Sequence, residues 1–196
     1  LNFAEGGTWY PTFPDHRGDA FMVNFAAKHR NSHGIQAVGT LSGKEKKGKV
    51  TVTRWNSKKP VDLYGFTVYK EITESRVEQE NAPAAVVYGE KLGDSDMRRN
   101  VAVDISNSLK FYRHIFQVEI PYKTVKGAYI DSTFGQALPG FLLLSRTTFR
   151  SEHPGATELF RAHETAHLIW GYIVDGKTYR DAWISEAFAE YSAMLY

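Results

Sequence analysis

The stretch R-A-H-E-T-A-H-L-I-W-G, from Arg161 to Gly171, contains two histidines four residues apart. On a helix, residues i and i+4 lie one turn apart on the same face, so His163 and His167 can present imidazole nitrogens to one cation. Glu164 can then lie beside the cation and accept a proton from water. A partly buried helix with two hydrogen-bonded histidines explains the same five residues, so the pattern alone leaves both interpretations open.

A second stretch, R-D-A-W-I-S-E-A-F-A-E-Y from Arg180 to Tyr191, offers a third ligand. Catalytic zinc normally has three protein ligands and one open position. Glu186 follows His167 after eighteen intervening residues, on the next expected helix, and the short connection predicts an antiparallel helix pair. Apolar neighbours such as Trp183 and Phe188 lead us to expect a buried carboxylate, whose desolvation a bound cation offsets. Two histidines and a glutamate favour zinc.

Composition narrows the class of protein. A chain of 196 residues with 42% hydrophobic residues can bury a substantial core. The charges of its 24 basic and 22 acidic residues nearly cancel, so the net charge does not indicate binding to nucleic acid or to an anionic membrane. Cysteine is absent, so any metal site must use His, Asp and Glu, and no apolar run predicts a membrane-spanning helix. The sequence starts at Leu1 without a signal peptide and is expected to be a piece of a longer chain, while compartment and oligomeric state do not follow from it.

Alternating apolar residues and turn signals predict a β-rich first part. The expected strands are residues 20–28, 34–42, 48–56 and 61–70. The lysine-rich stretch 42–49 is expected to be a solvated hairpin loop, because no aromatic residue interleaves its charges. A polar stretch then predicts a domain boundary near residues 72–83, which divides the chain into units 1–75 and 84–196.

The second part alternates between strand and helix. A helix is expected over 95–116, where apolar residues recur every three or four positions and Asp94 or Ser95 can cap its start. The other expected elements are strands 85–90, 124–131 and 140–149 and helices 155–173 and 179–196. Together the two parts predict an α+β fold.

These motifs resemble the gluzincin aminopeptidase family, the relatives of membrane alanyl aminopeptidase and leukotriene hydrolase. H-E-T-A-H-L-I-W-G followed by Y-R-D-A-W-I-S-E-A-F-A-E-Y is similar to the family's H-E-x-x-H, eighteen residues, and a glutamate in a W-L-x-E-G-F-A pattern. Residues 7–21 and the strands after them resemble the end of the family's N-terminal β-domain. Residues 108–131 resemble the start of its catalytic domain. The resemblance covers nearly the whole chain.

The resemblance implies a fold, a cofactor and a reaction. The fold is a β-rich N-terminal part followed by the first half of a thermolysin-like zinc-peptidase domain, with a small mixed sheet and zinc-binding helices. His163, His167 and Glu186 are implied to bind one Zn²⁺ ion, with Glu164 as the general base in hydrolysis of a peptide substrate. The family's transition-state tyrosine lies in a later helical region, so a fragment of this extent is expected to have little peptidase activity by itself.

One part of the family pattern is different here. The aminopeptidases have a G-x-M-E-N motif before the zinc helix, and its glutamate binds the substrate's free α-amino group. The matching stretch is F-G-Q-A-L-P-G-F-L-L-L-S, and aligning Pro139 and Gly140 with the family's N-x-G places Ala137 at the glutamate's position, beside the neutral Gln136. Alanine cannot pair with an ammonium group. We therefore expect this strand to hold an extended peptide through its backbone, while exopeptidase and endopeptidase activity both stay open.

Two further carboxylates are candidate partners of the histidines, because metal-binding imidazoles usually donate their other N–H to an acceptor. Glu190 lies one turn after Glu186, and Asp181 lies five residues before it. Either is equally explained as a surface charge, and Asp181 also as a helix-dipole partner.

The sequence therefore predicts an aminopeptidase-like zinc metallopeptidase. The alternatives are a non-catalytic zinc-binding scaffold and a zinc hydrolase without amino-terminal selectivity. Glu164 favours an enzyme, because a scaffold needs metal ligands but no base.

Overall fold

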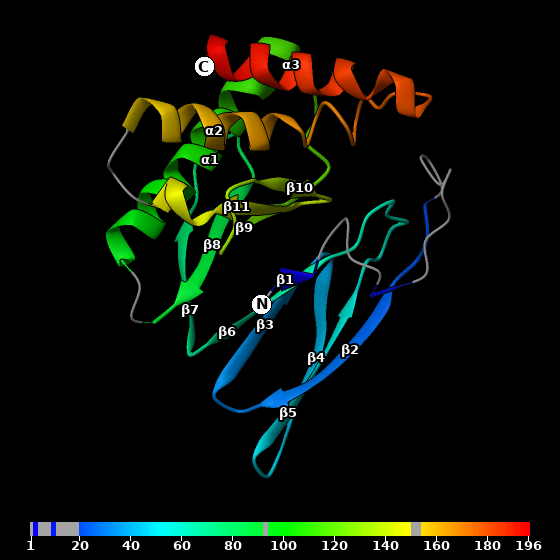
Figure 1. Cartoon of the computed structure of the whole chain (residues 1–196), viewed down its shortest axis with the longest axis vertical. Helices are drawn as coiled ribbons and strands as arrows, with labels where there is room; N and C mark the ends of the chain where they lie inside the picture. Colours follow the sequence, from blue (N-terminus) through cyan, green and yellow to red (C-terminus); the bar gives the residue numbers. More distant parts are fainter. Residues whose placement is uncertain (1, 4–8, 11–19, 92–93, 150–153) are drawn as a thin grey trace.

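A five-stranded mixed sheet forms the middle layer of the molecule (Figure 1). The computed structural model describes residues 2–3, 9–10, 20–91, 94–149 and 154–196. In sheet order, the five strands are β10 (Gln136–Leu138), β11 (Phe141–Ser145), β9 (Thr124–Ile130), β8 (Ala84–Glu90) and β7 (Ile72–Val77). The three inner strands are parallel, and the two edge strands are antiparallel to their neighbours.

Both faces of this sheet are covered, which explains the uninterrupted apolar run F-L-L-L in β11. Leu142 and Leu144 belong to the core cluster on the helical side. Phe141 and Leu143 belong to a second cluster, on the other face, together with Trp55 from the N-terminal part. The middle sheet therefore packs against the helices on one face and against the N-terminal sheets on the other.

Three α-helices in the described residues cover one face of the sheet (Figure 1). They are α1 (Ser95–Phe116), α2 (Pro154–Ala166) and α3 (Ala182–Leu195). The carboxylate of Asp94 caps α1 by accepting the N–H groups of Asp96 and Met97. α1 packs on β7 and β8, α2 packs on α1, and α3 packs on α2. None of the described helices has the length and apolar character needed to cross a membrane.

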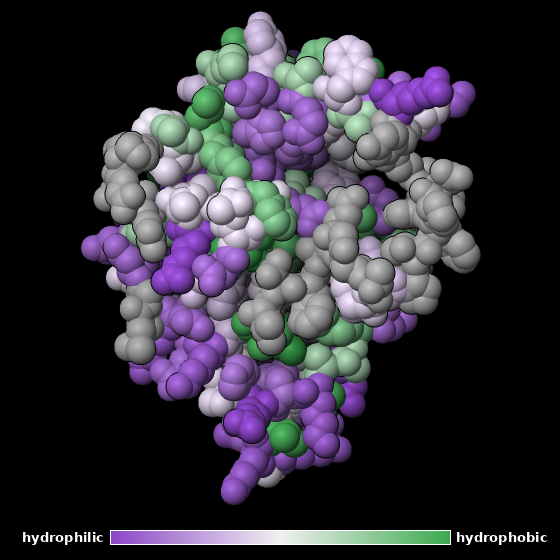
Figure 2. All heavy atoms as spheres, viewed as in Figure 1, coloured by the Kyte–Doolittle hydropathy of each residue, from purple (hydrophilic) through white to green (hydrophobic). Residues whose placement is uncertain are grey.

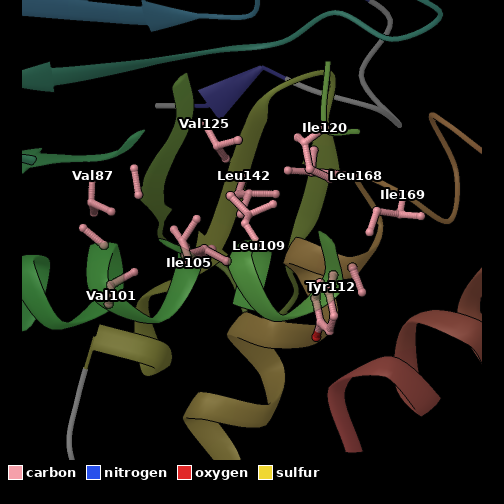
Figure 3. Close-up of a cluster of buried hydrophobic side chains, with 14 of the residues drawn as sticks. Val87, Val101, Ile105, Leu109, Tyr112, Ile120, Val125, Leu142, Leu168 and Ile169 are labelled. Carbon is pink, nitrogen blue, oxygen red and sulfur yellow. The ribbon is translucent and has the colours of Figure 1, made fainter. Parts of the chain in front are cut away.

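One face of α1 supplies the centre of the core beneath the helices (Figure 3). Val101, Ile105, Leu109 and Tyr112 recur every three or four residues, and all four are fully buried. They face apolar side chains from β8, β9 and β11. This packing fixes α1 on the sheet, and α1 in turn provides the surface on which α2 lies.

Two three-stranded antiparallel sheets lie on the other side of the middle layer (Figure 1). Their strands, in sheet order, are β1 (Asn2–Phe3), β6 (Phe66–Lys70) and β3 (His33–Ala37), and β2 (Asn24–Arg30), β5 (Val50–Asn56) and β4 (Thr40–Lys47). The end formed by β4 and β5 is farthest from the helices, and Figure 2 shows mainly hydrophilic side chains there.

This architecture confirms the predicted α+β class. α1 begins and ends where the apolar periodicity predicted, and β5 and β9 lie within the predicted strands 48–56 and 124–131. The division into units 1–75 and 84–196 stays a prediction. Residues 7–21, which carried part of the resemblance, lie largely outside the described residues.

The hairpin loop predicted over 42–49 is wrong. β4 continues through the lysines to Lys47, and only residues 48 and 49 form the turn, with Gly48 at a φ of 57°. The lysine side chains are exposed, and Glu45 forms ion pairs with Lys47 and Arg54. Pairing along β5 therefore overrides the low strand propensity of these residues.

The chain also differs from the predicted elements on either side of the proposed boundary. The polar stretch 72–83 contains a strand, β7, which pairs along β8. The predicted strand 34–42 is two strands, because the backbone turns at Gly39 with a φ of 84°. The polar composition of residues 72–83 therefore did not predict the edge strand β7. The pattern of residues 34–42 did not predict the turn at Gly39.

Two predicted elements of the second part end early. The strand expected over 140–149 stops at Ser145, whose hydroxyl oxygen accepts the N–H of Thr147 and whose carbonyl accepts the hydroxyl of Thr148. A 3₁₀ turn follows this strand. The helix expected over 155–173 stops at Ala166, because the chain then turns towards Gly171, which has a φ of 141°.

Lys126 connects the middle sheet to the N-terminal part. Its ammonium donates hydrogen bonds to the carbonyls of Ala37 and Gly39, and it lies 4.9 Å from the ring centroid of Trp55 and 5.4 Å from that of Phe141. Burial lowers the pKa of this lysine to about 7, because desolvation disfavours the charged form.

The Lys126 pKa predicts a pH-dependent stability. Its folded value lies below the usual 10.5, so above pH 7 the unfolded chain binds the extra proton and rising pH favours the folded state. We expect the urea midpoint of the wild-type chain to rise relative to that of Lys126→Met between pH 7 and pH 9. Methionine does not titrate, so an identical pH dependence in both chains would contradict the lowered pKa.

Candidate metal centre

The three candidate ligands come from α2, from the turn after it, and from α3. His163 lies in the last turn of α2. His167 follows the end of the helix, but its N–H still donates to the carbonyl of His163 at 3.2 Å, which preserves the i, i+4 relation. α3 lies beside α2 and runs in the opposite direction (Figure 1). This pairing places Glu186 next to the two histidines.

Three side-chain atoms converge at this point. The Nε2 atoms of His163 and His167 are 3.0 Å apart, and each lies 3.4 Å from Oε2 of Glu186. Within the described part of the chain, no other set of three or more histidine, aspartate or glutamate side chains has a geometry suited to a metal ion.

The other ring nitrogen of each histidine shows where its hydrogen lies. Nδ1 of His163 is 3.0 Å from Oε2 of Glu190, and Nδ1 of His167 is 3.1 Å from the carbonyl of Trp170. A carboxylate and a carbonyl only accept hydrogen bonds, so both Nδ1 atoms carry hydrogen. Burial lowers the pKa of His167, which favours its neutral form. In the neutral form of both rings, the two Nε2 lone pairs and the carboxylate of Glu186 face one another.

A cation between the two Nε2 atoms and Oε2 of Glu186 would offset their mutual repulsion, and the distances between these atoms fit zinc. Tetrahedral zinc with bonds of about 2.0–2.2 Å has ligand atoms about 3.3–3.6 Å apart. The observed separations of 3.0, 3.4 and 3.4 Å are close to that range. Neutral imidazoles whose other N–H is already donated are the form that ligates zinc.

Glu164 lies on α2, and its side chain approaches the segment that precedes β10. Its side chain is buried, and a Cβ atom placed on Gly135 would lie only 2.4 Å from its Oε1. Burial, followed by the negative charge of Glu186, raises the pKa of Glu164 to about 8. A desolvated carboxyl whose pKa lies near neutrality is suited to accept and return a proton.

The residues predicted to hold substrate lie in a hairpin beside Glu164. Gln136 and Ala137 belong to β10, and Pro139 and Gly140 form the tight turn to β11, with Gly140 at a φ of 68°. Among the described residues β10 pairs only with β11, so its other edge has no neighbouring strand. The hydroxyl of Tyr172 donates to the carbonyl of Ala137 at 2.7 Å and ties the hairpin to the turn after α2.

Glu190 and Asp181, the two carboxylates predicted as partners of the histidines, have different contacts. Glu190 accepts from His163, as described above. Asp181 instead accepts hydrogen bonds from the N–H and hydroxyl of Thr178 at 2.8 and 3.0 Å, in the turn before α3.

The expectation that Glu186 is buried is wrong. Its side chain is 66% exposed, and its apolar neighbours Trp183 and Phe188 are 68% and 45% exposed. Trp183 and Phe188 lie on partly exposed faces of α3, where Phe188 stacks on Trp170, while Ala189, Ser192 and Ala193 form the buried face. Desolvation of Glu186 therefore does not support the metal site, whereas the converging lone pairs do.

Three contributors to the site were missed in the sequence. Trp170 supplies the carbonyl that accepts from His167, and the hydroxyl of Ser185 donates to the same carbonyl and lies 3.3 Å from Nδ1 of His167. Gly135 leaves the space that the carboxyl of Glu164 occupies. Only the glycine had a recognisable signal, as a residue without a side chain directly before a strand.

The chain shares its fold with a zinc metallopeptidase. The crystal structure of the M1 zinc metallopeptidase from Deinococcus radiodurans matches it with a TM-score of 0.70 and 17% sequence identity. The match covers 90% of this chain and 40% of that one, so this chain spans less than half of the length of its structural neighbour. Models of protein families give no match, and neither do curated proteins. At this identity the likeness establishes the fold.

The contact between Glu190 and His163 predicts a selective effect on metal binding. Glu190→Ala should weaken zinc affinity about tenfold or more, because it removes the acceptor that orients the imidazole. Asp181→Ala is the matched control, since it removes a carboxylate from the same helix pair but only hydrogen bonds to Thr178. Competition with a chromophoric chelator measures both affinities. Equal losses in the two variants would show that Glu190 has no specific role.

Proposed function

We propose that this chain forms the zinc-binding part of an aminopeptidase-like metallopeptidase. The observation that carries the proposal is the convergence of the Nε2 atoms of His163 and His167 on Oε2 of Glu186, with both Nδ1 hydrogens already donated elsewhere. The shared fold with an M1 zinc metallopeptidase supports it. On this proposal the mixed sheet, α2 and α3 are the first half of a thermolysin-like domain.

The chemistry divides between the ligands and the buried carboxyl. A zinc ion held by His163, His167 and Glu186 supplies Lewis acidity, which polarises a peptide carbonyl and makes water easier to deprotonate. Glu164 accepts the proton of the attacking water and returns it to the leaving amine. Its carboxyl occupies the space that Gly135 leaves, which restricts the position of the group, and burial raises its pKa. Glu190 keeps the His163 ring oriented.

The substrate is proposed to lie along β10. No described strand pairs with the outer edge of β10, so this edge can pair with an extended peptide through backbone hydrogen bonds. The Pro139–Gly140 turn and the hydrogen bond from Tyr172 to Ala137 hold the edge in place. Gly135, directly before the strand, links this edge to Glu164. A peptide on β10 would therefore lie close to the proposed base.

Two substitutions separate metal binding from proton transfer. His163→Ala should reduce zinc from about one ion per chain to a trace, because it removes one of three ligands. Glu164→Gln should retain zinc, since Glu164 is not a proposed ligand, but should reduce turnover by a factor of about 100 or more in the protein that carries this chain. Elemental analysis and a peptide-cleavage assay provide the two measurements. Unchanged cleavage by Glu164→Gln would show that another group is the base.

The composition of β10 favours a peptidase without amino-terminal selectivity. The strand presents Gln136, Ala137 and Leu138, and none of these side chains can pair with an ammonium group as a carboxylate does. Peptides with acetylated amino termini should therefore be cleaved within about threefold of the rate for free peptides, since an ion pair worth 1.4 kcal/mol or more would give tenfold. Paired kcat/KM values measure this. A strong preference for free termini would mean that another residue binds the amine.

A further inference from the structure

A buried ion pair holds the side of α2 that faces away from the metal ligands. Nη2 of Arg161 lies 2.6 Å from Oδ2 of Asp104 on α1, and the two side chains are 5% and 20% exposed. Nη1 of Arg161 donates to the carbonyl of Thr148, also at 2.6 Å. One guanidinium therefore joins three segments: α1, α2 and the 3₁₀ turn (Arg146–Phe149) that follows β11.

The position of Arg161 connects this pair to the proposed zinc site. Arg161 precedes His163 by two residues, which is about 200° around a helix, so the two side chains leave α2 in nearly opposite directions. The intervening residue, Ala162, is also held, because its carbonyl accepts a hydrogen bond from the buried hydroxyl of Tyr112 at 3.1 Å. Any rotation of α2 that breaks these contacts also turns His163 away from Glu186.

Apolar packing constrains the rotation of α2 only in part. Ala162 and Ala166 are buried, and Phe160 is the one large side chain among the described residues of the helix that packs against the core cluster. Alanine methyl groups interdigitate less than larger side chains, so a small rotation or slide loses few contacts. The guanidinium of Arg161, in contrast, has fixed donor directions, with one Nη atom on Asp104 and the other on the carbonyl of Thr148.

We infer that Arg161 and Asp104 are positioning residues for the zinc ligands. The pair fixes the rotation of α2 about its axis and its distance from α1. The Nε2 atoms of His163 and His167 are thereby held 3.4 Å from Oε2 of Glu186. This inference rests on the proposed zinc site. It assigns a function to a pair whose contribution to stability is small, because desolvation of buried ions offsets much of their attraction.

A double substitution separates positioning from stability. Asp104→Leu alone would leave a guanidinium buried and unpaired, which is strongly destabilising. Arg161→Met together with Asp104→Leu fills the same space with apolar side chains, and such replacements commonly preserve or raise stability. The matched control is Arg113→Met with Glu119→Leu, which removes an ion pair of 2.9 Å near the far end of α1.

The readouts are thermal unfolding, zinc affinity by chelator competition, and the visible absorption of the cobalt-substituted chain. For the Arg161→Met, Asp104→Leu chain we expect an unfolding midpoint at or above that of the wild type. We also expect zinc affinity about tenfold weaker and an altered cobalt spectrum, because ligand placement is relaxed. The control pair should change neither metal readout.

Arg161→Lys provides a second test that does not depend on the double variant folding. Lysine keeps the charge but cannot reproduce the fork that reaches both Asp104 and Thr148. Its zinc affinity should lie between those of the wild type and the double variant, with the cobalt spectrum shifted.

Wild-type zinc affinity and cobalt spectrum in either Arg161 variant would overturn the positioning role. Failure of the wild-type chain itself to bind zinc, or zinc retention by His163→Ala, would instead contradict the proposed metal site. The two hypotheses therefore fail through different results.

Discussion

The structure of the candidate site depends on one electrostatic constraint, the convergence of two imidazole nitrogens and one carboxylate oxygen. These three atoms lie 3.0–3.4 Å apart, and the other nitrogen of each ring contacts Glu190 or the carbonyl of Trp170. With both rings neutral, the three atoms repel one another unless a cation lies between them. On the proposed function they would hold zinc, and the hydrogen bonds behind the rings would orient the two imidazoles towards it.

The layers of the fold hold these atoms in place. The middle sheet is buried on both faces, and α1 packs on it through a continuous apolar stripe. α2 lies on α1 and also contacts β10 and β11, and α3 lies on α2. Glu164, on α2, meets Gly135 in the segment that precedes β10. α2 therefore directs His163 towards Glu186 on α3 and Glu164 towards β10.

The sequence predicted this arrangement to the extent that it is local. The spacing of His163 and His167 and the periodicity of α1 depend on one helical turn at a time, and both appear in the structure as expected. Features that depend on tertiary neighbours were not predictable. The burial of Glu186 was inferred from apolar neighbours in the chain, but Trp183 and Phe188 are themselves largely exposed on α3. The lysines of β4 were assigned to a loop because their pairing with β5 cannot be read from charge alone.

The most direct test of the account is X-ray absorption at the zinc edge of the metal-loaded chain. The account predicts about one zinc ion per chain, with two imidazole nitrogens at about 2.0–2.1 Å and carboxylate or water oxygens completing the shell. It also predicts that His163→Ala abolishes this signature. A zinc shell without imidazole scattering, or one unchanged by His163→Ala, would contradict the convergence of His163, His167 and Glu186 as a metal centre.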